Sequence, residues 1–115
     1  MADKIKIIAG DVEMTATLVE SKTAKALVEV LPVESKGARW GDEIYFKIPL
    51  KTEGENLVAK VPSGAVAYWP PGNAFCIFFG QTPYSPVNVV GQLDGDPNEF
   101  AAVNEGDTVK LRKSE

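Results

Sequence analysis

Histidine is absent from the 115-residue sequence, and cysteine occurs only once. Without histidine the chain lacks the commonest general base and the commonest metal ligand in proteins, which excludes several classes of enzyme. A single cysteine can form neither an internal disulfide nor the cysteine cluster of a structural zinc site, and this usage fits a reducing compartment. We therefore expect no metal and no cofactor.

Long apolar runs and clustered positive charges are also missing. No apolar stretch approaches the roughly 20 residues needed to cross a bilayer, and the first residues lack the apolar core of a signal peptide. The net charge is −4, whereas proteins that bind a nucleic-acid backbone gather lysine and arginine on one face. These features predict a cytoplasmic protein that binds neither membrane nor nucleic acid.

The remaining composition is that of an ordinary globular protein. Hydrophobic residues make up 44% of the chain and charged residues 24%, far from the values of a disordered protein. The length suits one hydrophobic core, so we expect a single domain over residues 1–115.

Apolar and polar side chains alternate along most of the chain, with the period of half-buried strands. The segments 4–8 and 12–18, separated by Ala9-Gly10-Asp11, predict a β-hairpin. Further strands are predicted at residues 43–48, 57–61, 75–79, 87–93 and 108–112. Seven or eight short strands favour a closed or nearly closed β-barrel, which leaves no exposed sheet edges.

One short helix is expected at about residues 22–31. Ser21 can cap its start, Leu27 belongs to an apolar stripe at helical spacing, and Pro32 ends it. This stripe would close an open end of the barrel. A second helical turn is expected near residues 97–103.

The segment 64–80, GAVAYWPPGNAFCIFFG, is the most unusual part of the sequence. Two consecutive prolines fix the backbone and cannot lie inside a sheet, so the corner that they form must project from the barrel. Gly72 and Asn73 can then adopt positive φ angles. In the strand that follows, Cys76 and Phe78 should face one side, and Phe75, Ile77 and Phe79 the other. Because aromatic residues dominate small cores, we expect Phe75, Ile77 and Phe79 to lie in the barrel core.

Together with the segments 40–46 and 87–91, this region resembles the small prokaryotic cyclophilin-like family. The resemblance implies a closed eight-stranded antiparallel barrel with helices at its ends. It also implies a groove on the outer wall, where cyclophilins bind proline-containing peptides.

The same resemblance argues against efficient catalysis. A true cyclophilin uses an arginine near the strand that resembles residues 43–48, and a histidine in its pocket. The only arginines are Arg39 and Arg112, neither of which lies in that strand, and Lys47 lacks the planar fork of a guanidinium.

The candidates for ligand contact are residues of the expected groove and of the proline corner. Tyr68, Trp69 and Phe78 could equally pack in the wall of the barrel, Cys76 could be an inert buried thiol, and Arg39 an ordinary surface arginine. The full set of candidates is Arg39, Tyr45, Tyr68, Trp69, Asn73, Cys76, Phe78 and Gln81.

Three functions follow from these residues. The first is a noncatalytic binding module with a groove for a small ligand or a short peptide. The second is a peptidyl-prolyl isomerase in which Arg39 or a tyrosine hydroxyl replaces the missing arginine. The third is a structural protein whose aromatic side chains pair subunits, so that either a monomer or a homodimer is possible.

Overall fold

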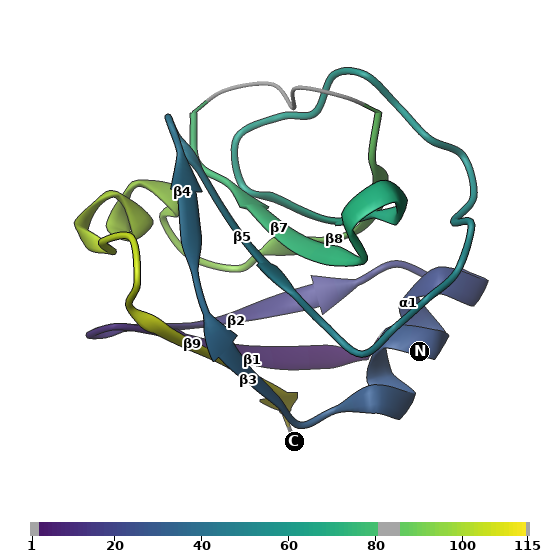
Figure 1. Cartoon of the computed structure of the whole chain (residues 1–115), viewed down its shortest axis with the longest axis horizontal. Coiled ribbons are helices and arrows are strands. Elements are labelled where there is room, and N and C mark those ends of the chain that lie inside the picture. Colours follow the sequence, from purple (N-terminus) through teal and green to yellow (C-terminus); the bar gives the residue numbers. More distant parts are fainter. Residues whose placement is uncertain (1–2, 81–85, 115) are drawn as a thin grey trace.

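The computed structural model describes residues 3–80 and 86–114. In that part of the chain nine strands form one antiparallel sheet with the order β3-β9-β1-β2-β8-β6-β7-β5-β4 (Figure 1). The strands are β1 (Lys4–Ala9), β2 (Val12–Leu18), β3 (Val33–Lys36), β4 (Ala38–Trp40), β5 (Glu43–Lys47), β6 (Ala65–Trp69), β7 (Ala74–Phe78), β8 (Asn88–Leu93) and β9 (Thr108–Lys113). The helices are α1 (Lys22–Val30) and the 3₁₀ helices η1 (Pro70–Gly72) and η2 (Pro97–Ala102).

One continuous segment joins the two ends of the sheet. Its first half, β3, pairs with β9, and its second half, β4, pairs with β5. Between them the Gly37 amide donates to the Asp107 carbonyl at 2.9 Å, and the Gly106 amide donates to the Gly37 carbonyl at 2.8 Å. A Cβ atom at Gly37 would lie 3.0 Å from Val109 Cγ2. The predicted antiparallel barrel is therefore confirmed, with nine strands instead of eight because this closing strand is divided at Gly37.

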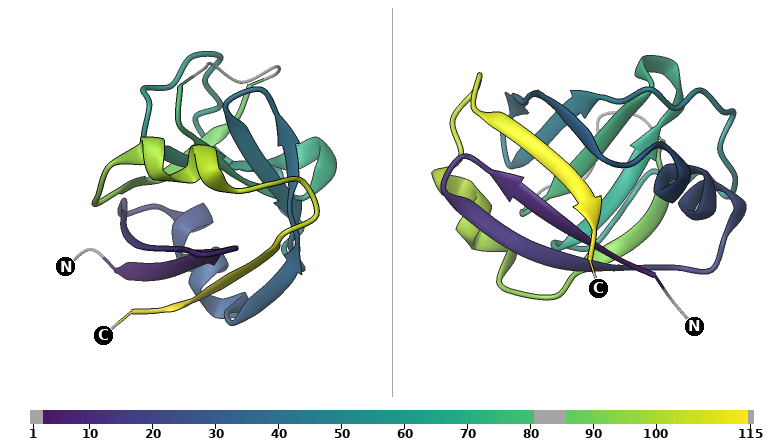
Figure 2. Two further views of the ribbon diagram at one scale, coloured as in Figure 1. Left: turned by 90° about the vertical axis from the view of Figure 1, so that its left-hand side faces the viewer. Right: turned by 90° about the horizontal axis from the view of Figure 1, so that it is seen from below.

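The predicted hairpin and both predicted helical segments are confirmed. β1 and β2 pair from Lys4↔Thr17 to Ala9↔Val12. The Ser21 hydroxyl accepts from the Ala24 amide at 3.1 Å and caps α1, whose buried Leu27 contributes to the barrel core. In both Figures 1 and 2, α1 and η2 lie at opposite ends of the barrel. No helix in residues 3–80 and 86–114 is long and apolar enough to cross a membrane.

The predicted strand at 57–61 is wrong. Only Val58 makes a β-bridge there, with Val87, and no other strand occurs between β5 and β6. Left-handed backbone at Gly54 and Asn56, with φ of 77° and 50°, interrupts the extended conformation just before this segment. Residues 49–64 therefore form a long connection, which we call the cover segment.

Candidate functional site

The outer face of strands β5, β7, β6 and β8 carries an apolar cluster that is separate from the barrel core. We call it the outer cluster, and it consists of Val61, Ala65, Ala67, Cys76, Phe78 and Val87, with Tyr45, Trp69 and Val89 packed against it. The strand register places Tyr45, Cys76, Ala67 and Val89 in one row across the four strands. This is the outer wall on which the resemblance placed the groove.

The alternation predicted for β7 is confirmed. Phe75, Ile77 and Phe79 belong to the barrel core, whereas Cys76 and Phe78 belong to the outer cluster. Pairing with β5 and β6 fixes these directions along the strand, because every second side chain points to the same face.

The centre of the expected groove is covered by the chain itself. Phe78 is 0% exposed and Cys76 is 2% exposed. Val61 of the cover segment and Val87 contribute to the same cluster. The rim residues Tyr45, Trp69 and Val89 are only half-buried. While the cover segment stays in place, a ligand can therefore contact only this rim.

Tyr68 lies on the opposite side of the sheet. Its side chain belongs to the barrel core and is 1% exposed. Its hydroxyl donates to the Leu50 carbonyl at 2.7 Å, lies 3.1 Å from Asn73 Oδ1, and accepts from the Thr52 amide at 3.3 Å. Tyr68 and Asn73 therefore tie the proline corner to the start of the cover segment.

The proline corner forms helix η1. Asn73 has the expected positive φ, 49°, but Gly72 does not. Glycine is instead required at residue 72 because a Cβ atom there would lie 2.4 Å from Trp69 Cζ3. The ring of Trp69 thus rests against the corner. Gln81, the last candidate from the sequence, lies outside the described residues.

The side chain of Arg39 is bound to backbone carbonyls at one end of the barrel. It pairs with inward-facing Ile44, and its guanidinium lies 5.2 Å from the ring centroid of Phe79. Its Nη1 donates to the carbonyls of Ala101 and Val103 at 2.9 and 2.8 Å, and its Nε donates to the carbonyl of Gly41 at 3.1 Å. This arginine fastens β4 to η2, on the other side of the sheet from the outer cluster.

Sequence analysis missed Glu43 as a candidate site residue. It directly follows Asp42 of a turn, and adjacent acids in such a place are usually exposed to solvent. It is only 8% exposed, and its carboxylate accepts a hydrogen bond from the thiol of Cys76. Burial raises the pKa of Glu43, although the bond from Cys76 works in the opposite direction. Burial, the charge of Glu43 and this bond raise the pKa of Cys76 well above 9.0, so the thiol is a poor nucleophile.

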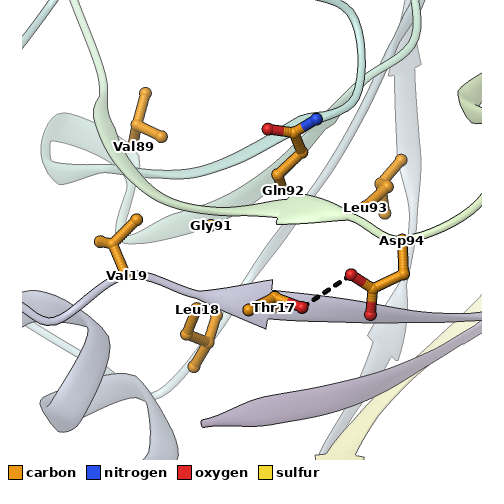
Figure 3. Close-up of a pocket in the computed structure, with 8 residues that line it drawn as sticks. All are labelled: Thr17, Leu18, Val19, Val89, Gly91, Gln92, Leu93 and Asp94. Carbon is orange, nitrogen blue, oxygen red and sulfur yellow. Dashed lines mark hydrogen bonds between the residues drawn. The ribbon is translucent and has the colours of Figure 1, made fainter. Parts of the chain in front are cut away.

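An open pocket of about 510 Å³ adjoins the outer cluster, where β2 and β8 meet (Figure 3). Val89 belongs to both. The pocket is lined by Thr17, Leu18, Val19, Val89, Gly91, Gln92, Leu93 and Asp94. Exposed Gln92 offers an amide donor and acceptor, and Val19, 46% exposed, adds apolar surface.

Asp94, at the polar end of this pocket, already has hydrogen-bond and ion-pair partners within the protein. It accepts hydrogen bonds of 2.7 Å from each of the hydroxyls of Thr15 and Thr17, and the Lys4 ammonium lies 3.5 Å away. Although partial burial acts in the opposite direction, these groups hold the pKa of Asp94 below its usual value. Within residues 3–80 and 86–114, no group of three or more acidic or cysteine side chains could hold a metal ion.

Comparison with known proteins agrees with the barrel fold. The sequence profile of the family described as cyclophilin-like matches residues 3–112. The chain belongs to the cyclophilin-like family. No curated protein matches this cyclophilin-like chain.

Solved structures of similar fold include the following two. The solution structure of the hypothetical protein AF2241 from Archaeoglobus fulgidus is 33% identical and has a TM-score of 0.84, and the match covers 98% of this chain and 95% of that one. McbB in complex with tryptophan is 20% identical with a TM-score of 0.75. That match covers 96% of this cyclophilin-like chain but only 44% of McbB.

Proposed function

We propose that this cyclophilin-like chain is a binding module that holds a small ligand or a short proline-containing peptide on its outer wall, without efficient prolyl isomerisation. The observation that carries the proposal is the outer cluster with its half-buried rim of Tyr45, Trp69 and Val89. Val89 connects this rim to the open pocket between β2 and β8. Concave apolar surface with a few polar groups, here the amide of Gln92, is typical of ligand sites.

The lack of efficient catalysis is supported by the position of Arg39. Its guanidinium is bound to three backbone carbonyls at the end of the barrel, so it cannot polarise a prolyl amide on the outer wall. The outward residue Glu43 occupies the strand where the resemblance expects an arginine. A small ligand is further supported by McbB, which shares this fold over 44% of its length and was solved in complex with tryptophan.

Two measurements on one short peptide containing Ala-Pro test the proposal. In NMR titration we expect the amide signals of Tyr45, Trp69 and Val89 to shift on addition of the peptide. In a protease-coupled assay we expect no acceleration of cis–trans isomerisation over the uncatalysed reaction. Turnover that is clearly above background in the parent protein and lost in Phe78→Ala would show an isomerase and contradict the proposal.

A matched pair of variants locates the ligand. Val89→Lys places a charge where the rim and the pocket meet, and we expect it to weaken peptide binding on the order of tenfold. Thr108→Lys adds the same charge to a half-buried position on β9, three strands away in the sheet, and should leave binding unchanged. Equal effects of the two variants would argue against a ligand site on this wall. So would a dimer that light scattering finds at all protein concentrations, if Trp69 is buried in its interface.

A further inference from the structure

Glu43 lies on the outer face among three aromatic side chains. It pairs with Trp40 across β4 and β5, and with Phe78 across β5 and β7. Tyr45 is the next outward residue along β5, since side chains two positions apart share a face. The Cys76 thiol, which donates to the carboxylate, completes its described surroundings. Among the described residues, this largely buried acid therefore has aromatic side chains and a weak thiol donor as its neighbours.

No cationic partner of Glu43 occurs among the described residues. Ion pairs between described residues include Lys4–Asp94, Lys6–Glu13 and Lys110–Glu34. Lys47 is on the same face of β5, but four residues along a strand amount to roughly 13 Å. Burying a carboxyl without a counter-ion costs free energy, and such groups are concentrated at functional sites.

The chemistry of this position favours one class of ligand. Aromatic faces attract cations, with tryptophan the strongest, and a carboxylate removed from water binds an ammonium through a charge-assisted hydrogen bond. A thiol uses little of the acceptor capacity of a carboxylate, so oxygen lone pairs remain for a stronger donor. A neutral alcohol of the same shape would gain only the aromatic contact.

We propose that the ligand of the outer wall carries a primary ammonium or another compact organic cation, which binds Glu43 between the side chains of Trp40 and Tyr45. This inference rests on the proposed function, because it names the ligand class of the same wall. The cation enters from the β4–β5 hairpin, where Trp40 is 45% exposed, and Glu43 lies directly across from it.

Benzylamine and benzyl alcohol form a matched pair of probes, because they share ring and size and differ in charge at pH 7. We expect benzylamine to shift the amide signals of β5 and β7 around Glu43, with an affinity on the order of tenfold higher than that of benzyl alcohol. Glu43→Gln should abolish this preference. Glu34→Gln, which removes the charge of a side chain that is 65% exposed on β3, should retain it.

A second measurement needs no variant and holds even if Glu43→Gln does not fold. The side-chain carboxyl carbon of Glu43 is titrated by NMR in the parent protein, with and without saturating benzylamine. A bound ammonium stabilises the carboxylate, so the midpoint of the Glu43 titration should move to lower pH with benzylamine and stay in place with benzyl alcohol.

The outcomes separate this inference from the proposed function. Equal affinities for the two probes, a preference that survives in Glu43→Gln, or an unmoved Glu43 midpoint would overturn the cation site. The proposed function would still stand if the Ala-Pro peptide shifted Tyr45, Trp69 and Val89. If neither probe nor peptide perturbed the outer wall, both would be rejected.

Discussion

The carboxyl group of Glu43 lies where its charged form is less stable than it would be in water. Burial raises its pKa above the ordinary value of 4.5. A raised pKa of an acid contributes stability that is fully present below the unfolded value and is lost as the pH rises through the folded value. Cys76 stays protonated across this range, since its own pKa is raised well above 9.0.

Glu43→Gln should therefore stabilise the free protein at neutral pH, even though it removes the proposed cation site. Glutamine keeps the shape of the neutral acid and cannot ionise. In urea denaturation the variant should gain on the order of 1 kcal/mol over the parent at pH 7, and the difference should shrink towards zero at pH 4. A difference that does not depend on pH, or that grows on acidification, would contradict the assignment. A substitution that increases stability is typical of a position where the native residue is kept for function.

For single residues, the sequence predicted the face of the strand to which a side chain points better than it predicted the neighbours of that side chain in the fold. Alternation correctly placed Cys76 and Phe78 opposite Phe75, because the strand period is a local property of the backbone. The burial of Glu43 depends on Phe78 and Cys76, which lie more than 30 positions further along the chain, and no local pattern carries that information. The role of Arg39 likewise depends on the carbonyls of η2, which only the closed barrel brings near.

Among the elements, the contact between β2 and β8 depends on a single glycine. A Cβ atom at Gly91 would lie 2.5 Å from the Thr17 carbonyl oxygen and 3.1 Å from Leu18 Cα. Both are backbone atoms of a paired strand, so neither can move without separating β2 from β8. This close approach also shapes the floor of the pocket between the two strands.

Gly91→Ala should destabilise the protein by about 1–3 kcal/mol, the usual cost of overpacking. Gly95→Ala is the control, because a Cβ atom there would meet only the side chain of Met14, whose nearest atom is Cε at 3.0 Å. That flexible thioether can move aside. Chemical denaturation of both variants gives the comparison. A loss in Gly91→Ala no larger than in Gly95→Ala would show that the two strands separate easily.

The elements that the sequence predicted best are those with strong local signals. The hairpin of β1 and β2 has alternation on both sides of a glycine turn, and α1 has a serine cap and a proline stop. The segment 57–61 has a strand-like composition but meets only Val87. Strand formation needs a partner along its length, and such a partner is a property of the whole fold. For the same reason the division of the closing strand at Gly37 could not be predicted.

At the scale of the whole molecule, two apolar clusters lie on opposite sides of one wall. The barrel core is enclosed by the closed sheet, with α1 contributing to its packing. The outer cluster is closed by the cover segment, whose two ends are tied to the barrel by the hydrogen bonds of Leu50 and Thr52 with Tyr68 and of Gly64 with Phe78 and Leu93. Between these ends, residues 55–61 are held by the bridge between Val58 and Val87 and by hydrogen bonds of Glu55 with Asn88 and Thr23. Few buried contacts and few backbone hydrogen bonds are typical of units that open below the global unfolding free energy.

If the cover segment opens while the barrel stays folded, Cys76 becomes exposed. The rate at which this thiol is modified under native conditions therefore measures the opening of the cover segment. Val61→Ala removes a side chain that is 9% exposed from the outer cluster, and Val33→Ala removes one that is 7% exposed from the barrel core. Each truncation should cost on the order of 1–3 kcal/mol. We expect only Val61→Ala to speed the reaction of Cys76 with a thiol reagent on the order of tenfold at low denaturant, because only it weakens the cover. If the two rates instead follow the global stabilities of the variants, the cover and the barrel unfold as one unit, and a ligand can reach only the rim of the outer cluster.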